Sequence, residues 1–150
     1  MNQGFLENTF AQGQVKGDIS LFNRALAKGR RSRIVARIFG IFQHGRDAQH
    51  KVSKVSGKST KLSKVRSVLI KNIRPNEMKD KNFDQNFYPI NKESQHRWMS
   101  VARARMRNIS LPAVELAKVG EAYIVIDGHH RISVAKALGE DFVDAKVRNA

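Results

Sequence analysis

The 150-residue chain contains no cysteine, and it has no long apolar run. Without cysteine, a thiolate nucleophile and a cysteine-containing zinc site are excluded. No segment is long enough to span a bilayer, and residues 2–15 lack the cationic start and continuous apolar stretch of a secretory signal. We therefore expect a cytoplasmic protein with no membrane span.

Acidic residues are also scarce, with 13 Asp and Glu against 28 Lys and Arg, a net charge of +15. Residues 1–66 hold fourteen basic and three acidic side chains (14 − 3 = +11), whereas residues 67–150 hold the other fourteen basic and ten acidic ones (14 − 10 = +4). The 41% hydrophobic content suffices for one ordinary domain plus an appendage. We expect a basic N-terminal extension over residues 1–64 and a domain over residues 65–150.

The extension has two parts. Residues 18–42 are compatible with a helix, with a break expected near Gly29. Residues 43–64 are rich in Gly, Ser and Lys and are typical of a flexible basic linker. The two apolar sets of the helical part are Ile19, Phe22, Ala25 and Leu26, and then Ile34, Val35, Ile38, Phe39 and Phe42.

Three arginines in the extension, Arg30, Arg33 and Arg37, recur at helical spacing and should share one face. Three uses of such a helix remain open. Its apolar stripe can pack on the domain or on a second copy in a homodimer. Its arginines can contact the phosphates of DNA or RNA, an attraction that the high net charge favours. It can also lie on an anionic membrane surface.

The most informative segment is YIVIDGHHR, residues 123–131. A β-branched run ends at Asp127 and Gly128, and an apolar helical pattern then follows until Gly139. Such a junction presents unpaired backbone N–H groups and the positive end of a helix dipole, and Arg131 adds a cationic fork suited to phosphate oxygens. The segment predicts a phosphate site.

Other interpretations of the same residues exist. Asp127 can serve as a helix cap, and the His-His-Arg triplet can be a solvated rim. Zinc binding by His129 and His130 is less favoured, because adjacent helical residues point about 100° apart and no cysteine or spaced third histidine completes a tetrahedral set.

Three motifs in order, IRPNE at 73–77, LPAVEL at 111–116, expected to form a strand, and the segment 127–139, carry a resemblance to a known superfamily. Residues 65–147 resemble the nucleotide-binding domain shared by ParB partition proteins, sulfiredoxins and ParB-like free-serine kinases. The resemblance implies a small α+β domain with a mixed sheet and packed helices. It also implies a nucleotide cofactor, ATP, ADP or CTP with Mg²⁺, whose phosphates lie at the strand-turn-helix segment.

The branches of this superfamily differ at position 129. The corresponding segment of sulfiredoxins is similar to Gly-Cys-His-Arg, in which the cysteine is the attacking thiolate. This chain has no cysteine, so that reaction is excluded. The corresponding segment of ParB proteins is similar to Gly-Glu-Arg-Arg, and these proteins bind CTP. The form present here, Asp-Gly-His-His-Arg, resembles that of the free-serine kinases.

That resemblance implies roles for individual residues. Glu77 would be a general base, and Asp127 would hold Mg²⁺ or position the acceptor. The segment Gly128, His129, His130 and Arg131 would hold the phosphates and offset the charge of the transition state, which places His129 among the catalytic groups. The competing interpretation of Glu77 is an exposed turn residue after Pro75.

The remainder of the domain has recognisable local patterns. Residues 82–89 are expected to form a loop whose aromatic side chains anchor it to the core. Residues 92–107 suit a helix with Trp98 on its apolar side, and residues 141–147 alternate as a last strand does.

Two functions follow from these patterns. The first is a nucleotide-binding, ParB-like protein that is regulatory or associated with nucleic acid through its basic extension. The alternative is an ATP- or ADP-dependent phosphotransferase in which Glu77 activates a small hydroxyl acceptor such as serine. A third interpretation is a degenerate domain that binds nothing and serves as an interaction surface.

Overall fold

The computed structural model describes residues 16–32, 34, 64–76 and 78–149. Residues 35–42 of the expected helix and 43–63 of the expected linker lie outside this part. A helix over residues 16–32, called here the N-terminal helix, precedes the domain. The domain comprises β1 (Arg66–Leu69), η3 (Ile70–Asn72), β2 (Ile73–Arg74), α3 (Gln95–Met106), β3 (Val114–Val119), β4 (Ala122–Asp127), α4 (His129–Ala137) and β5 (Phe142–Asn149).

The five strands form one mixed sheet in the order β1-β5-β3-β4-β2. The β1–β5 and β3–β4 pairs are antiparallel, whereas β3–β5 and β2–β4 are parallel. Strands β3 and β4 form a hairpin in which Val119 is paired with Ala122 and Gly120 takes a positive φ of 58°. The expected α+β fold with a mixed sheet and packed helices is confirmed.

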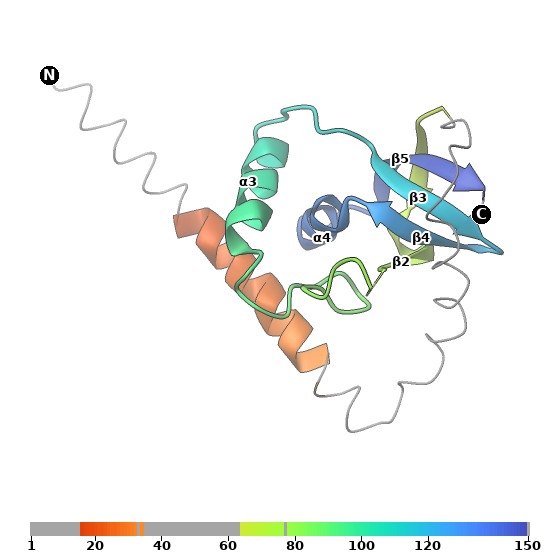
Figure 1. Cartoon of the computed structure of the whole chain (residues 1–150). Helices are drawn as coiled ribbons and strands as arrows, with labels where there is room; N and C mark the ends of the chain where they lie inside the picture. The colour runs from red at the N-terminus through yellow and green to blue at the C-terminus, as the bar shows by residue number, and fades with distance from the viewer. Residues whose placement is uncertain (1–15, 33, 35–63, 77, 150) are drawn as a thin grey trace, which may run out of the picture.

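Helix α4 is the central layer of the molecule. One of its faces packs on the sheet in a core that includes Leu116, Val125 and Ile132. The other side packs, through Val134, in a second core with Trp98 of α3 and with the N-terminal helix. Figure 1 shows this order, with α4 between the sheet and α3 and the N-terminal helix on the outer side. A displacement of α4 would therefore disturb both cores.

The N-terminal helix packs on the domain. Phe22 is fully buried and meets Trp98 edge-on, with ring centroids 5.4 Å apart. Asp18, also buried, accepts a hydrogen bond from Nε of Arg103 at 2.5 Å. Of the three uses considered for the extension, packing on the domain is the one that this helix makes.

Gly29 does not break the helix, contrary to the sequence-based expectation. It lies inside the N-terminal helix, and a Cβ atom there would stand 2.4 Å from the carbonyl oxygen of Pro89. The glycine thus allows the helix and the 83–89 loop to approach closely, which local sequence patterns do not reveal.

Other boundaries differ from the expected ones by a few residues. The strand expected over 111–116 begins at Val114 and runs to Val119. Residues 111–113 precede the strand, and the carbonyls of Pro112 and Ala113 accept hydrogen bonds from Arg131. The loop is anchored to the core as expected, because Phe83 and Phe87 are buried.

No helix within the described ranges is long and apolar enough to cross a membrane.

Candidate functional site

The turn between β4 and α4 is built around Gly128. Its φ of 111° lies in the left-handed region, and a Cβ atom there would come within 2.6 Å of Cγ1 of Val114. Only glycine satisfies both conditions without strain. No side chain caps the start of α4, so the role of helix cap proposed for Asp127 is not found. The first-turn N–H groups have no acceptor within the helix, and they lie at its positive end.

The Arg131 side chain links this turn to the residues that precede β3. Its Nη1 donates to the carbonyl oxygens of Pro112 at 2.6 Å and Ala113 at 3.0 Å, and its Nη2 donates to the Asp127 carboxylate. The Arg131 side chain is 15% exposed and that of Asp127 is 61% exposed. An anion that approaches Nη2 therefore competes with a carboxylate that faces solvent, while Nη1 remains bound to the start of β3.

His129 joins α4 to the IRPNE segment. Its buried Nε2 accepts a hydrogen bond from the backbone N–H of Asn76 at 3.0 Å. The proton of the neutral ring is thereby assigned to Nδ1. Burial lowers the pKa of His129, which keeps the ring neutral at pH 7. The side chain of His129 thus holds the Asn76 turn in place. A phosphate contact by His129 stays a prediction, and its backbone N–H is the group that can make it.

The segment held by His129 forms a tight turn at Asn76. The Asn76 carbonyl accepts the N–H groups of Lys79 at 3.0 Å and Asp80 at 3.1 Å, and its Oδ1 accepts that of Met78 at 3.2 Å. Asn76 is buried, whereas Met78 and Lys79 are exposed. The turn therefore brings the IRPNE segment to the start of α4, as the resemblance implies. Glu77 itself lies outside the described residues.

His130 lies on the other side of the helix start. Its ring meets Phe83 edge-on at 4.9 Å, and its Nδ1 is 3.9 Å from Oδ2 of Asp80. Its Nε2 is buried and has no hydrogen-bond partner within the described residues. Burial lowers the pKa of His130, Asp80 opposes this shift, and the positive charge of Arg97 adds to it. A neutral imidazole nitrogen is thus left for a further polar partner.

Two basic residues near the helix start were missed by sequence reasoning. Lys79 is exposed, and its Nζ donates to the carbonyl of Ile126 at 3.4 Å. Arg97 of α3 is exposed, and its positive charge further lowers the pKa of His130. Three cations, Lys79, Arg97 and Arg131, and two carboxylates, those of Asp80 and Asp127, thus act on the start of α4. Arg97 is 33 residues from His130 in the sequence, so no local signal marks it.

Of the three residues expected to bind nucleic acid, Arg30 alone lies in the described part of the chain. Arg30 is exposed on the N-terminal helix. Arg33 and Arg37 lie outside the described residues, so their common face stays a prediction.

A resident metal site has little support in the described part of the chain. No cluster of three or more His, Cys, Asp and Glu residues capable of holding a metal occurs there. The Asp127 carboxylate is exposed and pairs with Arg131. One carboxylate of this kind fits an Mg²⁺ ion that arrives on nucleotide phosphates and keeps most of its waters. The donor set fits phosphate oxygens better than a metal held by the protein alone.

Comparison with protein-family models found no match, and comparison with curated proteins found none either. Among solved structures, sulfiredoxin from Arabidopsis thaliana matches at 17% identity and a TM-score of 0.44, over 59% of this chain and 88% of that chain. This chain is similar in fold to the ParB and sulfiredoxin proteins. The C-terminally truncated partitioning protein ParB from Caulobacter crescentus, complexed with CTP-gamma-S, matches at 14% identity and a TM-score of 0.44, over 59% of this chain and 46% of that one.

A free serine kinase in complex with AMP matches at 20% identity and a TM-score of 0.42, over 59% of this chain and 32% of the kinase chain. The chain thus spans less than half of the length of the ParB and kinase structures.

Proposed function

We propose that the start of α4 binds the phosphates of a nucleotide, ATP, ADP or CTP with Mg²⁺. The observation that carries this proposal is the helix start at Gly128, which no side chain caps and where a left-handed glycine places no Cβ atom against Val114. A helix N-terminus of this kind favours anions through its N–H groups and its dipole. Lys79 and Arg131 add positive charge beside it. The Asp-Gly-His-His-Arg motif and its resemblance to the nucleotide-binding superfamily support the same ligand.

Calorimetric titration with ATP, ADP and CTP in the presence of Mg²⁺ tests this proposal. The informative variant is Lys79→Ala, because Lys79 is exposed and its removal spares the contacts that Arg131 makes with β3. We expect about fivefold weaker nucleotide binding, which corresponds to roughly 1 kcal/mol for one partly exposed charge.

The matched control is Lys118→Ala, which removes an exposed lysine at the opposite end of β3 and should leave affinity unchanged. Absence of binding by the wild type contradicts the proposal. Equal loss in both variants contradicts the location of the site.

For the role of the nucleotide, we propose a regulatory protein associated with nucleic acid. Exposed cations on the N-terminal helix support this role, whereas its one acidic residue within the described range, Asp18, is buried and bound to Arg103. The exposed cations are Lys16, Arg24, Lys28, Arg30 and Arg31. Such a surface attracts nucleic-acid phosphates without reading their sequence.

The alternative is phosphotransfer to a small hydroxyl acceptor such as serine, with Glu77 as the general base and Asp127 beside the metal. The hydrogen bond between Asn76 and His129 favours it, because this bond fixes the residue before Glu77 at the start of α4. Glu77→Gln should abolish nucleotide turnover while nucleotide affinity stays nearly unchanged. Undiminished turnover in Glu77→Gln would remove the general-base role and leave the binding proposal intact.

A further inference from the structure

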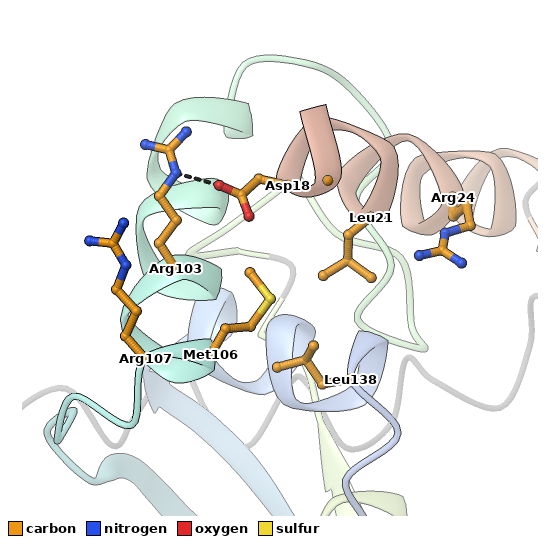
Figure 2. A pocket seen from close by; sticks show the side chains of 8 residues that line it. Asp18, Leu21, Arg24, Arg103, Met106, Arg107 and Leu138 are labelled. Atoms are coloured by element: carbon orange, nitrogen blue, oxygen red, sulfur yellow. Dashed lines mark hydrogen bonds and ion pairs between the residues drawn. The ribbon is translucent and has the colours of Figure 1, made fainter. Parts of the chain in front are cut away.

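A cavity of about 410 Å³ lies far from the Gly128 turn, between the N-terminal helix and the C-terminal ends of α3 and α4. Its volume falls in the range of small-molecule sites. Figure 2 shows the residues that line it on these three elements. The lining residues are Gly17, Asp18, Leu21, Arg24, Arg103, Met106, Arg107 and Leu138.

The floor of this cavity is apolar. Leu21 and Leu138 border the second core and are only partly buried, and Met106 is 47% exposed. In Figure 2 the three side chains face the space between the helices. A ligand with an apolar body would remove this surface from water, at roughly 25 cal/mol per Å². The floor therefore selects for hydrocarbon and disfavours a bare inorganic ion.

The rim of the cavity is positively charged. Three arginines, Arg24, Arg103 and Arg107, line the rim together with a single carboxylate, that of Asp18. The carboxylate is bound to Arg103 at 2.5 Å, so it offsets the charge of Arg103 and not that of Arg24. Arg24 extends from the N-terminal helix toward Leu21 (Figure 2) and has no ion-pair partner among the described residues. A cationic rim over an apolar floor complements a molecule with one anionic head and one apolar body.

We propose that this cavity binds a small amphiphilic carboxylate, with the apolar chain on Leu21, Met106 and Leu138 and the head group beside Arg24. The cavity, of about 410 Å³, has room for a body of about eight carbon atoms. The site is distinct from the phosphate site, because Leu138 follows the C-terminal end of the nine-residue helix α4 and Gly128 precedes its start. That length separates the two by about 13 Å. The proposal therefore stands or falls independently of nucleotide binding.

Titration of the full chain with octanoate, followed by NMR of ¹³C-labelled methionine methyl groups, tests the proposal. The chain contains four methionines, so the spectrum is simple, and Met106→Leu identifies the Met106 signal. We expect a saturable shift of the Met106 methyl signal, while Met78, which is 69% exposed near the start of α4, serves as the internal control. Acetate, which lacks the chain, and octanol, which lacks the charge, should each bind at least tenfold more weakly.

The variant Arg24→Ala should weaken octanoate binding about fivefold, whereas Arg30→Ala, which removes an exposed arginine from the same helix, should not change it. Binding of octanoate with no Met106 shift overturns the proposal, as does a shift confined to Met78. Equal affinity for octanol, equal affinity of the Arg24 variant and the wild type, or no octanoate binding also overturns it.

Discussion

Gly128 is the residue that opens the start of α4. Gly139, after the end of the same helix, also has a positive φ, of 81°, but a Cβ atom there would have no neighbour within 4 Å. Alanine substitution at Gly139 therefore tests backbone strain alone, whereas alanine substitution at Gly128 tests backbone strain together with a steric clash. At Gly139 only the left-handed conformation disfavours alanine, whereas at Gly128 the close contact with Val114 is added.

We expect Gly139→Ala to lower the free energy of unfolding by about 1 kcal/mol, the usual cost of a left-handed alanine. Gly128→Ala should lower it by about 2–5 kcal/mol, because overpacking against Val114 adds to that strain. Urea unfolding of the two variants measures both values. Equal destabilisation of the two variants would contradict the account of the Gly128 turn.

A second prediction at the residue scale concerns His129. Its pKa in the folded protein lies below the ordinary value of 6.5 because the ring is buried. The unfolded chain therefore binds a proton more readily, and the stability contributed by the neutral ring is full above pH 6.5 and is lost as the pH falls below that value. Protonation of Nε2 also removes the acceptor of the Asn76 N–H.

We expect the unfolding free energy of His129→Gln to vary less with pH than that of the wild type as the pH falls below 6.5. The difference in slope is at most one proton, about 1.4 kcal/mol per pH unit. Asp84, whose pKa burial raises, acts in the opposite sense but equally in both proteins. Chemical unfolding at several pH values measures the slopes, and parallel curves would refute the role assigned to His129.

At the scale of elements, α4 links the phosphate site to the rest of the fold. Its Ser133 Oγ accepts a hydrogen bond from Nε1 of Trp98 at 2.8 Å, and both side chains are fully buried. This bond joins α4 to α3, the helix that carries Arg97. The position of Arg97 near His130 thus depends on the packing of the two helices.

Ser133→Ala should leave the Trp98 N–H buried without an acceptor and lower the free energy of unfolding by about 1–3 kcal/mol. Ser100→Ala, an exposed change on α3, is the control and should alter stability by less than about 0.5 kcal/mol. Thermal and urea unfolding of both variants decide the point. A Ser133 variant as stable as the Ser100 variant would show that the bond does not hold the two helices together.

The elements that sequence reasoning found were those encoded by short-range patterns. The run of β4, the turn at Gly128 and the extent of α4 follow from β-branched residues, a turn dipeptide and a terminal glycine. The short strands β1 and β2 were not identified, because their four and two residues pair only with strands distant in sequence.

The candidate site shows the same division. The strand-turn-helix backbone of the site was predictable. The hydrogen bond between Asn76 and His129 spans 53 residues, and no local sequence pattern predicts it. The resemblance predicted that the IRPNE segment contributes to the site. Lys79 and Arg97 were recognised only in the structure. Sequence patterns thus predict where a ligand would bind, while tertiary packing determines which side chains surround that place.

At the scale of the whole molecule, the net charge of +15 favours polyanionic partners. We expect the protein to bind a short DNA duplex with an affinity that falls steeply as salt rises. Joint substitution of Arg30, Arg33 and Arg37 by alanine should reduce the slope of log affinity against log salt by up to about 2.7, or about 0.9 for each phosphate that is no longer neutralised. Fluorescence anisotropy at several salt concentrations measures the slope.

The control for this triple variant replaces three lysines in or next to the sheet, Lys71, Lys118 and Lys146, and removes the same charge. It should change the slope less. A salt-independent interaction, or an equal change in both triple variants, would contradict a role of the basic extension in nucleic-acid binding.

The central claim is that nucleotide phosphates lie at the start of α4, and ¹H–¹⁵N NMR of the backbone amides during an ADP–Mg²⁺ titration tests it most directly. We predict saturable shifts of the amide signals of Gly128, His129, His130 and Arg131, the groups that have no acceptor within the helix. The amide of Lys118, at the far end of β3, should stay unchanged. No saturable shift at residues 128–131, whether ADP binds elsewhere or not at all, would contradict the account.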